Sequence, residues 1–532
     1  MRVDRPLAGK VSAIAALALL LQLLFLSRMP GLNADAAWKA RRSYYTVCRG
    51  EYVVTGVTPG NGVLHEYLFA LCFAALGPTV FAIRLPFVVM NAAAIVLVWM
   101  FIRRFYDDTA GLICALMMAV YPWFVIKLRV AWPPSAIPFM MMLTLWLLST
   151  DRPPAVFLGG IVMGLGCYDY QPFMALPLAL LALFAIYRRR VPAGLRGAGM
   201  LLAGAACGYA PKILAYLLYG DPWMRGPLTP FPAVLKKAVI CVPYFMRIMD
   251  GGIIFLRTTG RIAVPVAPLN SVVLLGSIAL LLRDRGSISR PLVAALCIFF
   301  ALAVIPDTLT SMRYFIFAMT TASLISGLGV YRLYRAHRGA GVVALRLFVT
   351  VNAFYIACNF FVELGRTGGS LAVFRSGNFD EMSHGYVRMD VLYDALDPRV
   401  AVVVALDPLI ERNLRFYDIG GGRFSIVNAP PPGCAEFYLV NFADSRRIDP
   451  SQFAHCDAAR EHTELKNFAV WRIRERGAPR GPAGARQSSA ILGACPSNVS
   501  RRQASGPPPG TSRLGVAPAS AYGAEYAFGL AP

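Results

Sequence analysis

The chain alternates between long apolar stretches and short polar segments over most of its length. An apolar helix of about 20 residues, rising about 1.5 Å per residue, crosses the roughly 30 Å hydrocarbon core of a bilayer. The pattern therefore predicts about eleven membrane spans. The predicted spans are 11 to 27, 85 to 102, 109 to 126, 135 to 150, 155 to 168, 172 to 187, 197 to 219, 267 to 282, 291 to 305, 314 to 331 and 342 to 362.

Segment 64 to 78 is apolar but short, and it carries His65 and Glu66 near its start. If this segment crossed the membrane, Arg103 and Arg104 would lie on the side opposite to Arg190 and its two arginine neighbours. If it lies in the interface instead, the compact basic segments share one side, and these are 103 to 104, 188 to 190, 283 to 290 and 332 to 338. Because basic loops favour the cytoplasm, we expect an interfacial or re-entrant helix and a cytoplasmic N-terminus.

Hydropathy falls after residue 362, and the pattern of 363 to 475 predicts a small α/β domain. Segments 400 to 406 and 437 to 440 are typical of buried strands. An odd number of spans places this domain outside the cytoplasm. Residues 476 to 532 are rich in Gly, Pro, Ala, Ser and Arg, which predicts a disordered tail. The predicted fold class is mainly α, a polytopic membrane helical bundle over 1 to 362 with a small C-terminal α/β soluble domain.

The composition agrees with a membrane protein. Hydrophobic residues make up 57% of the chain, charged residues 15%, and the mean hydropathy is +0.55, which excludes an ordinary water-soluble globule. The net charge of +23 does not indicate nucleic-acid binding, because the bases lie in loops between spans. No CxxC or Cys/His metal spacing is present. Cys434 and Cys456 lie in the predicted soluble domain and pair if that domain faces an oxidising compartment, or remain reduced if it does not.

The first outward loop, 28 to 63, contains candidate chemistry. Asp35 lies shortly after the first span, and Arg41 and Arg42 follow it. Bases on the side that the positive-inside tendency disfavours fit an anionic ligand such as a lipid phosphate or diphosphate. They also fit an amphipathic segment that rests on anionic headgroups. The pattern alone leaves both interpretations open.

Other outward segments add candidate substrate-binding residues. Arg129 and Trp132 lie at a span end, where Trp also serves as an interface anchor. Asp169 lies in a turn between two apolar spans, where an acid indicates function unless the turn reaches water. The remaining candidates are Glu66, Arg257, Arg261, Arg313 and Tyr314.

Four motifs occur in a fixed order relative to the predicted spans. They are GLNADAAW at 31 to 38, LGP at 76 to 78, FAIRLP at 81 to 86 and RVAWPPS at 129 to 135. This arrangement resembles the GT-C superfamily of integral membrane glycosyltransferases, in particular the bacterial branch similar to protein O-mannosyltransferases and aminoarabinose transferases. The resemblance covers roughly residues 10 to 335.

The resemblance implies that Asp35 is the catalytic base and that the sugar donor is a polyprenyl phosphate. It further implies a lipid, glycan or protein acceptor on the outer face of a bacterial inner membrane. The family commonly carries a second acid where this chain has Ala36, and another in the loop that here contains 132 to 135. Related enzymes use such acids to bind a metal or orient the acceptor. Because this chain lacks both acids, no divalent metal is assigned to it. Glu51, Glu66 or Asp169 are candidates to replace them.

Two other functions remain open from the sequence. A transporter or flippase for an anionic or lipid-linked substrate would also use outward bases, although such proteins commonly show internal repeats and paired broken spans, and no convincing repeat is evident. A non-catalytic member of a glycan assembly complex would account for the missing acids.

Overall fold

The structure is a computed structural model. It describes residues 5–27, 31–50, 56, 61–150, 152–187, 195–219, 231–251, 268–284, 288–305, 312–364, 389–419, 422–430, 436–442, 456–461, 468–474 and 476. These residues belong to one compact unit, Met1–Gly493. Apart from Arg476, the predicted tail 476 to 532 lies outside the described residues.

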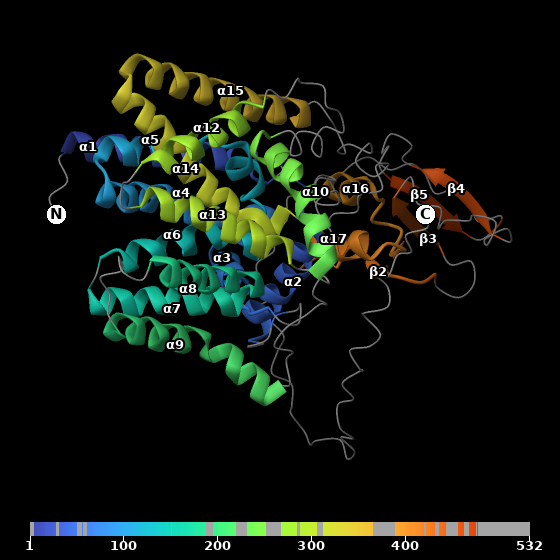
Figure 1. Cartoon of the computed structure of the whole chain (residues 1–532). Coiled ribbons are helices and arrows are strands. Elements are labelled where there is room, and N and C mark those ends of the chain that lie inside the picture. The colour runs from blue at the N-terminus through green and yellow to red at the C-terminus, as the bar shows by residue number, and fades with distance from the viewer. Residues whose placement is uncertain are drawn as a thin grey trace. The chain divides into compact units, whose positions relative to one another are not determined.

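The first half of the bundle follows the predicted spans, and many of its helices lie side by side (Figure 1). A helix that the hydropathy pattern places in the membrane satisfies its own backbone hydrogen bonds, as lipid requires. The helices are α1 (Arg5–Leu23), α2 (Ala34–Arg49), α3 (Leu64–Leu76), α4 (Val80–Phe105), α5 (Asp108–Ala119), α6 (Ile137–Leu148), α7 (Pro153–Asp169), α8 (Ala175–Tyr187) and α9 (Leu195–Tyr219). Short helical turns η1 (Trp123–Lys127), η2 (Pro133–Ala136) and η3 (Gln171–Met174) lie between them.

The second half contains α10 (Phe231–Met249), α12 (Leu269–Arg283), α13 (Ser289–Val304), η5 (Met312–Phe315), α14 (Ile316–Ala336) and α15 (Arg338–Leu364). Helix α10 lies between the predicted spans 197 to 219 and 267 to 282, where no span is predicted. Its Lys237 and Arg247 make it too polar for an uninterrupted apolar span. It nevertheless buries Cys241, Phe245 and Ile248 on one side, as an amphipathic helix does.

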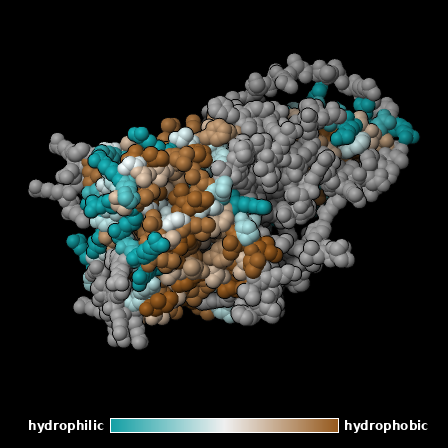
Figure 2. Space-filling model, turned by 45° about the horizontal axis from the view of Figure 1, so that its top comes forward, coloured by the Kyte–Doolittle hydropathy of each residue, from teal (hydrophilic) through white to brown (hydrophobic). Residues whose placement is uncertain are grey.

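The helical part has the surface of a membrane protein. Figure 2 shows a broad band of hydrophobic side chains on the face in view, with hydrophilic side chains gathered along its edge. Leu217, Leu71 and Leu202 are 71%, 68% and 68% exposed, and lipid would cover such side chains. Among the described residues, four helices are long and apolar enough to cross a membrane, and several apolar helices are shorter. Helix α14 is almost wholly buried inside the bundle, whereas α9 and α15 are largely exposed.

Glycines bring α7 and α9 into backbone contact. A Cβ built on Gly164 would lie 2.2 Å from the carbonyl oxygen of Ala205, and one built on Gly208 would lie 2.2 Å from the carbonyl oxygen of Ile161. Gly160 and Gly204 make equally close approaches. Each helix therefore carries two glycines four residues apart, the spacing that allows membrane helices to approach closely.

One end of the bundle gathers the compact basic segments. Tyr106, just after α4, shares a 2.7 Å hydrogen bond with Ser289 at the start of α13. Ser289 donates to Asp284 at 2.6 Å, and Arg332 of α14 pairs with the same carboxylate. Three basic segments that were predicted to share a side therefore meet, namely 103 to 104, 283 to 290 and 332 to 338; the fourth, 188 to 190, lies outside the described residues.

Both ends of α3 lie at the other end of the bundle. Before α3, Gly62 N–H donates to the carbonyl of Asp169 at 3.3 Å, and α7 reaches this end at its last residue. After α3, Arg84 of α4 donates to the carbonyls of Leu26 and Gly31 at 2.7 and 2.8 Å. Arg84 and the basic end of α4 are separated by about 28 Å at about 1.5 Å per residue. Whether 64 to 78 lies in the membrane interface stays a prediction.

The C-terminal region contains a five-stranded sheet in the order β2-β1-β3-β5-β4. Strand β1 is parallel to β2 and β3, and β5 is antiparallel to β3 and β4. The strands and helices are α16 (Met389–Ala395), β1 (Val402–Ala405), α17 (Pro408–Tyr417), β2 (Ser425–Val427), β3 (Phe437–Phe442), β4 (Asp457–Glu461) and β5 (Phe468–Arg474). The two strands predicted from the sequence are confirmed as β1 and β3, and every residue of β3 is buried, as its apolar sequence predicts.

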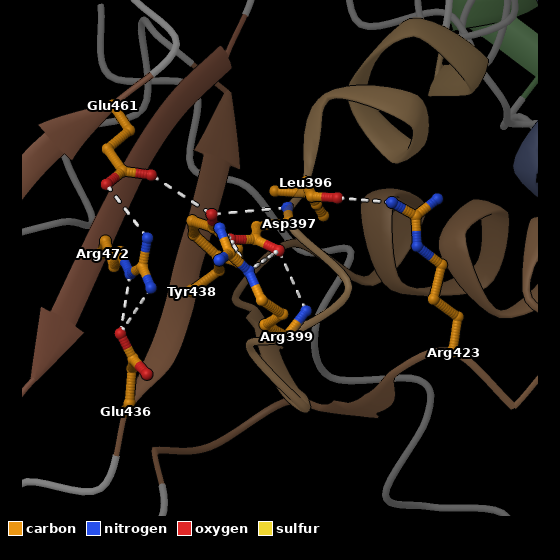
Figure 3. Close-up of polar contacts among 8 residues, drawn as sticks. All are labelled: Leu396, Asp397, Arg399, Arg423, Glu436, Tyr438, Glu461 and Arg472. Carbon is orange, nitrogen blue, oxygen red and sulfur yellow. Dashed lines mark hydrogen bonds and ion pairs between the residues drawn. The ribbon is translucent and has the colours of Figure 1, made fainter. Parts of the chain in front are cut away.

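Polar contacts connect the strands to the segment before β1 (Figure 3). Tyr438 of β3 donates its hydroxyl to Glu461 of β4 at 3.2 Å and accepts the N–H of Asp397 at 3.4 Å. Burial raises the pKa of Tyr438 to about 12, so the hydroxyl stays protonated and able to donate. Hydrogen bonds from Arg399 lower the pKa of Asp397.

Candidate active site

Asp35 lies in the first turn of α2, and local sequence determines where that helix begins and ends. The side chain of Asn33 accepts the N–H of Asp35 at 2.8 Å, an N-cap that satisfies one of the free donors of the helix start. Gly50 ends the helix with φ of 66°, a left-handed conformation that glycine adopts readily. The Asp35 side chain remains 29% exposed, so it is accessible from the surface of the described part.

Two buried arginines hold the segment that leads to Asp35. Arg84 bonds the carbonyls of Leu26 and Gly31, and Arg129 bonds the carbonyl of Leu24. Both guanidinium groups are inaccessible to solvent. The carbonyls that follow the end of a helix have no intrahelical partner, and a guanidinium supplies donors for several of them. Arg129, predicted to bind substrate, thus has a structural contact at the base of the Asp35 segment.

A buried polar network joins α2, α3 and α7. Arg42 Nε lies 2.6 Å from Glu66 Oε2, and Glu66 is 4% exposed. The Nδ1 atom of His65 lies 2.8 Å from Asp169 Oδ1, and the backbone N–H of His65 donates to the same oxygen at 3.3 Å. Asp169 is 4% exposed, so the interpretation that it is merely solvated is wrong. His65 was not singled out from the sequence, although its place next to Glu66 at the start of an apolar segment was a usable signal.

A second group of predicted residues surrounds Trp132. Lys127 Nζ lies 4.5 Å from the centre of the Trp132 ring, and Arg313 lies 5.8 Å from it. Arg313 also lies 5.0 Å from the ring of Tyr314. Trp132 and Lys127 are 4% and 3% exposed. Cations at such distances are attracted by aromatic faces, so Lys127 joins the three predicted members Trp132, Arg313 and Tyr314.

Some predicted site residues do not join these groups. Arg41 donates to the hydroxyl of Tyr45 at 3.0 Å on its own helix. Arg257, Arg261 and Glu51 lie outside the described residues. Within the described part of the chain, no group of three or more His, Cys, Asp or Glu side chains is placed to hold a metal ion.

Arg412 of α17 is a further site contact that was not predicted from the sequence, as His65 and Lys127 were not. Its Nη1 atom lies 3.4 Å from Asp35 Oδ1, and its guanidinium carbon lies 4.4 Å from the centre of the Trp38 ring. Arg412 follows Asp35 by 377 residues, and no motif near it indicates this partner. The contact brings a residue of the C-terminal region to the candidate base.

Comparisons with known proteins agree with this architecture. A family model described as dolichyl-phosphate-mannose-protein mannosyltransferase matches residues 60–207. The crystal structure of ArnT from Cupriavidus metallidurans bound to undecaprenyl phosphate matches with a TM-score of 0.57 at 13% identity, over 89% of this chain and 99% of that chain. The chain has the GT-C glycosyltransferase fold.

Two further structures with the GT-C fold are similar. ArnT from Cupriavidus metallidurans in the apo state matches with a TM-score of 0.56 at 13% identity, over 87% of this chain and 98% of that chain. The oligosaccharyltransferase AglB from Archaeoglobus fulgidus, in complex with an inhibitory peptide and a dolichol-phosphate, matches with a TM-score of 0.47 at 13% identity, over 88% of this chain and 74% of that chain. No curated protein matches the sequence significantly.

The GT-C resemblance predicted from the motifs is confirmed, as is the mainly α class with a small sheet near the C-terminus. The family model and the ArnT match relate the chain to membrane glycosyltransferases. The number of spans stays a prediction, because several apolar helices are short.

Proposed function

We propose that this chain moves a sugar from a polyprenyl-phosphate donor to a lipid, glycan or protein acceptor, with Asp35 as the catalytic base. The observation that carries the proposal is the setting of Asp35. Its carboxylate is partly exposed in the first turn of α2, and Arg84 and Arg129 fix the preceding segment at the bundle end opposite the basic segments. The GT-C fold and the mannosyltransferase family model support this reaction class.

The proposed step is a substitution at the anomeric carbon of the donor sugar. Asp35 takes the proton of the acceptor hydroxyl as its oxygen forms a bond to that carbon. The bond between the anomeric carbon and the phosphate oxygen breaks, and the phosphate leaves with the electron pair as polyprenyl phosphate. Because negative charge develops on the departing phosphate, nearby cations stabilise the transition state. The step balances with no oxidant, reductant or nucleotide.

The group around Trp132 is the proposed binding site for the rest of the donor. Lys127 and Arg313 supply positive charge beside two aromatic rings. Arg and Lys bind phosphate by charge-assisted hydrogen bonds, and an aromatic ring offers an apolar face to a sugar or isoprenoid. Glu66 and Asp169 belong to the buried network, which supports a role in holding α2 and α3 in position.

The proposed location is a bacterial inner membrane, with the basic segments in the cytoplasm and Asp35 and the C-terminal sheet outside. The positive-inside tendency supports this orientation. Cys48 at the end of α2 and Cys456 beside β4 are both disulfide-bonded, and disulfides persist in oxidising compartments. The partner predicted for Cys456, Cys434, lies outside the described residues, so that pairing stays a prediction.

Substitution Asp35→Asn tests the proposal. We expect transfer of labelled sugar from a polyprenyl-phosphate donor to fall by about a hundredfold or more, because a general base contributes about 10² to 10⁴ in rate. The measurement is the initial rate of new glycosidic bond formation by the full chain in lipid nanodiscs, against a panel of acceptors.

Asp108→Asn is the matched control. Asp108 also lies in the first turn of a helix and also pairs with an arginine, Arg103, at 3.4 Å, but it lies at the basic end of the bundle. It should transfer at the wild-type rate. Near-normal transfer by Asp35→Asn would contradict the proposal. Wild-type vesicles that move a labelled lipid-linked sugar across the bilayer without forming a glycosidic bond would favour the transporter instead.

A further inference from the structure

We propose that Arg412 is a positioning residue of the site: it bridges Asp35 and the phosphate of the donor, so that the C-terminal region completes the site. This inference rests on the proposed function. It starts from two contacts of one guanidinium, the ion pair with Asp35 at 3.4 Å and the cation–π contact with Trp38 at 4.4 Å. Asp35 and Trp38 are three residues apart in α2 and therefore neighbours on one helix face.

Helix α17 is fixed from two sides, which determines where Arg412 lies. Asp407 caps its start by accepting the N–H of Leu409 at 2.8 Å. Ile410 and Leu414 are buried in the hydrophobic core of the sheet. Phe416 is 2% exposed and belongs to the hydrophobic core of the bundle. Because residues four apart lie on the same helix face, Arg412 lies on the side that Phe416 anchors to the bundle.

The ion pair between Arg412 and Asp35 is exposed enough for Arg412 to bind a ligand while it stays in contact with Asp35. It is a contact between Arg412 Nη1 and Asp35 Oδ1 at 3.4 Å, and the side chains of Arg412 and Asp35 are 25% and 29% exposed. Water therefore reaches both groups, and the pair is weak compared with a buried, bidentate one. A guanidinium has five N–H donors in a planar fork, so it can contact a carboxylate and a phosphate at the same time.

Electrostatics gives a reason for such a bridge. A carboxylate that acts as base must come close to a donor whose phosphate is also negative, and two negative charges repel each other. A cation shared between them offsets this repulsion and brings both to the same place. Trp38 holds the guanidinium at the position where it meets Asp35, so the bridging charge is in place before the donor binds.

The test measures binding of undecaprenyl phosphate, with undecaprenol as the uncharged comparison, to the full chain in nanodiscs. We expect Arg412→Met to weaken binding of the phosphate by about tenfold, because one charge-assisted hydrogen bond is of that order. Arg412→Lys keeps the charge but not the planar fork of donors, so it should recover only part of the affinity. Binding of undecaprenol should not change in either variant. With a saturable donor, Arg412→Met should raise KM more than it lowers kcat.

Arg415→Met is the matched control. Arg415 lies on the same helix and pairs at 2.9 Å with Glu411 of that helix, so its loss should leave phosphate binding unchanged. In the Asp35→Asn background the effect of Arg412→Met should shrink, because the repulsion that Arg412 offsets is then absent. Thermal unfolding of each variant shows whether it is folded.

Three outcomes would overturn the inference. They are unchanged phosphate binding in Arg412→Met, an equal loss of undecaprenol binding, and an equal effect of Arg415→Met. In each of these cases the wild type still binds the phosphate and the proposed function stands. A wild-type chain that binds undecaprenyl phosphate no better than undecaprenol would instead count against the proposed function itself.

Discussion

Helix α2 makes two contacts between an arginine and a carboxylate, and they differ in kind. Toward α3, Arg42 and Glu66 meet at 2.6 Å, and the Glu66 side chain is 4% exposed whereas that of Arg42 is 23% exposed. Toward α17, Asp35 and Arg412 meet at 3.4 Å, and about a quarter of each side chain is exposed. The two pairs differ in their carboxylates: Glu66 is buried and closely held, whereas Asp35 is exposed at the candidate catalytic end of the helix.

The difference indicates which charged residues stabilise the fold and which are available for binding and transfer. Once one partner of a buried ion pair is removed, the other remains as an uncompensated charge, which is strongly destabilising. An exposed pair contributes little to stability because water competes for both groups. We therefore expect Arg42 and Glu66 to matter for folding, and Asp35 and Arg412 to matter for binding and transfer.

The largest expected effect on stability comes from Glu66→Gln. It removes the buried negative charge that Arg42 meets at 2.6 Å; because Arg42 is partly exposed and water can solvate it, we expect the free energy of unfolding to fall by about 1 to 2 kcal/mol. Denaturant unfolding of the full chain in mixed micelles measures this change. Glu411→Gln is the control, because its partner Arg415 is one turn away and a third exposed, and it should cost at most about 0.5 kcal/mol. Equal losses of unfolding free energy in Glu66→Gln and Glu411→Gln would contradict the difference in stability expected between the two pairs.

A smaller effect is expected from Asn33→Ala, which removes the cap of α2. Loss of a helix cap costs about 1 kcal/mol. Hydrogen exchange of the Asp35 amide should become faster, and transfer should slow because the candidate base loses its fixed position. Thr79→Ala removes the comparable cap of α4, which accepts the N–H of Ala82 at 3.1 Å. It should cost similar stability with little change in transfer; a similar loss of transfer would show that the effect is not specific to α2.

The smallest effect is expected from an exposed pair outside the bundle, Asp397 and Arg399 (Figure 3). Hydrogen bonds from Arg399 lower the pKa of Asp397. The stabilisation is therefore present above the unfolded pKa, about 3.9, and is lost as pH falls through the lower folded value. Since Arg399 is 55% exposed, Asp397→Asn should cost at most about 0.5 kcal/mol at pH 7.

Hydrogen exchange of the turn at residues 397 to 400 measures this effect. The Arg399 amide donates to Asp397 Oδ1 at 3.0 Å, so its exchange reports the pair directly. Wild type and variant should differ at neutral pH and converge in acid. A difference that persists below both pKa values would mean that the carboxylate charge is not its source.

Much of the helical architecture follows from hydropathy, because each apolar run must bury its own backbone polar groups as a helix. Helix α10 escaped prediction because Lys237 and Arg247 interrupt its apolar residues. Strands β1 and β3 are buried and apolar and were predicted. Strand β4 was not, since its central residues are exposed and its sequence gives no alternating pattern.

The candidate site was predictable where local sequence carries the signal. Asp35, Glu66 and Asp169 stand out because acids beside or between apolar spans are rare, and Trp132 stands out as part of the motif at 129 to 135. Their partners did not, because the pairing of Asp169 with His65 and of Asp35 with Arg412 depends on how distant segments pack. The sequence around an arginine in an ordinary amphipathic helix such as α17 does not predict which distant residue the arginine contacts.

The contact between α7 and α9 has a consequence for how a long isoprenoid reaches the protein. A single methyl-sized group on Gly164 or Gly208 would already overlap the facing backbone. A prenyl chain is thicker than that group, so it cannot slip between these two helices where the glycines meet. The lipid tail of the proposed donor therefore has to enter and leave through another side of the bundle, because the contact between α7 and α9 is closed to it.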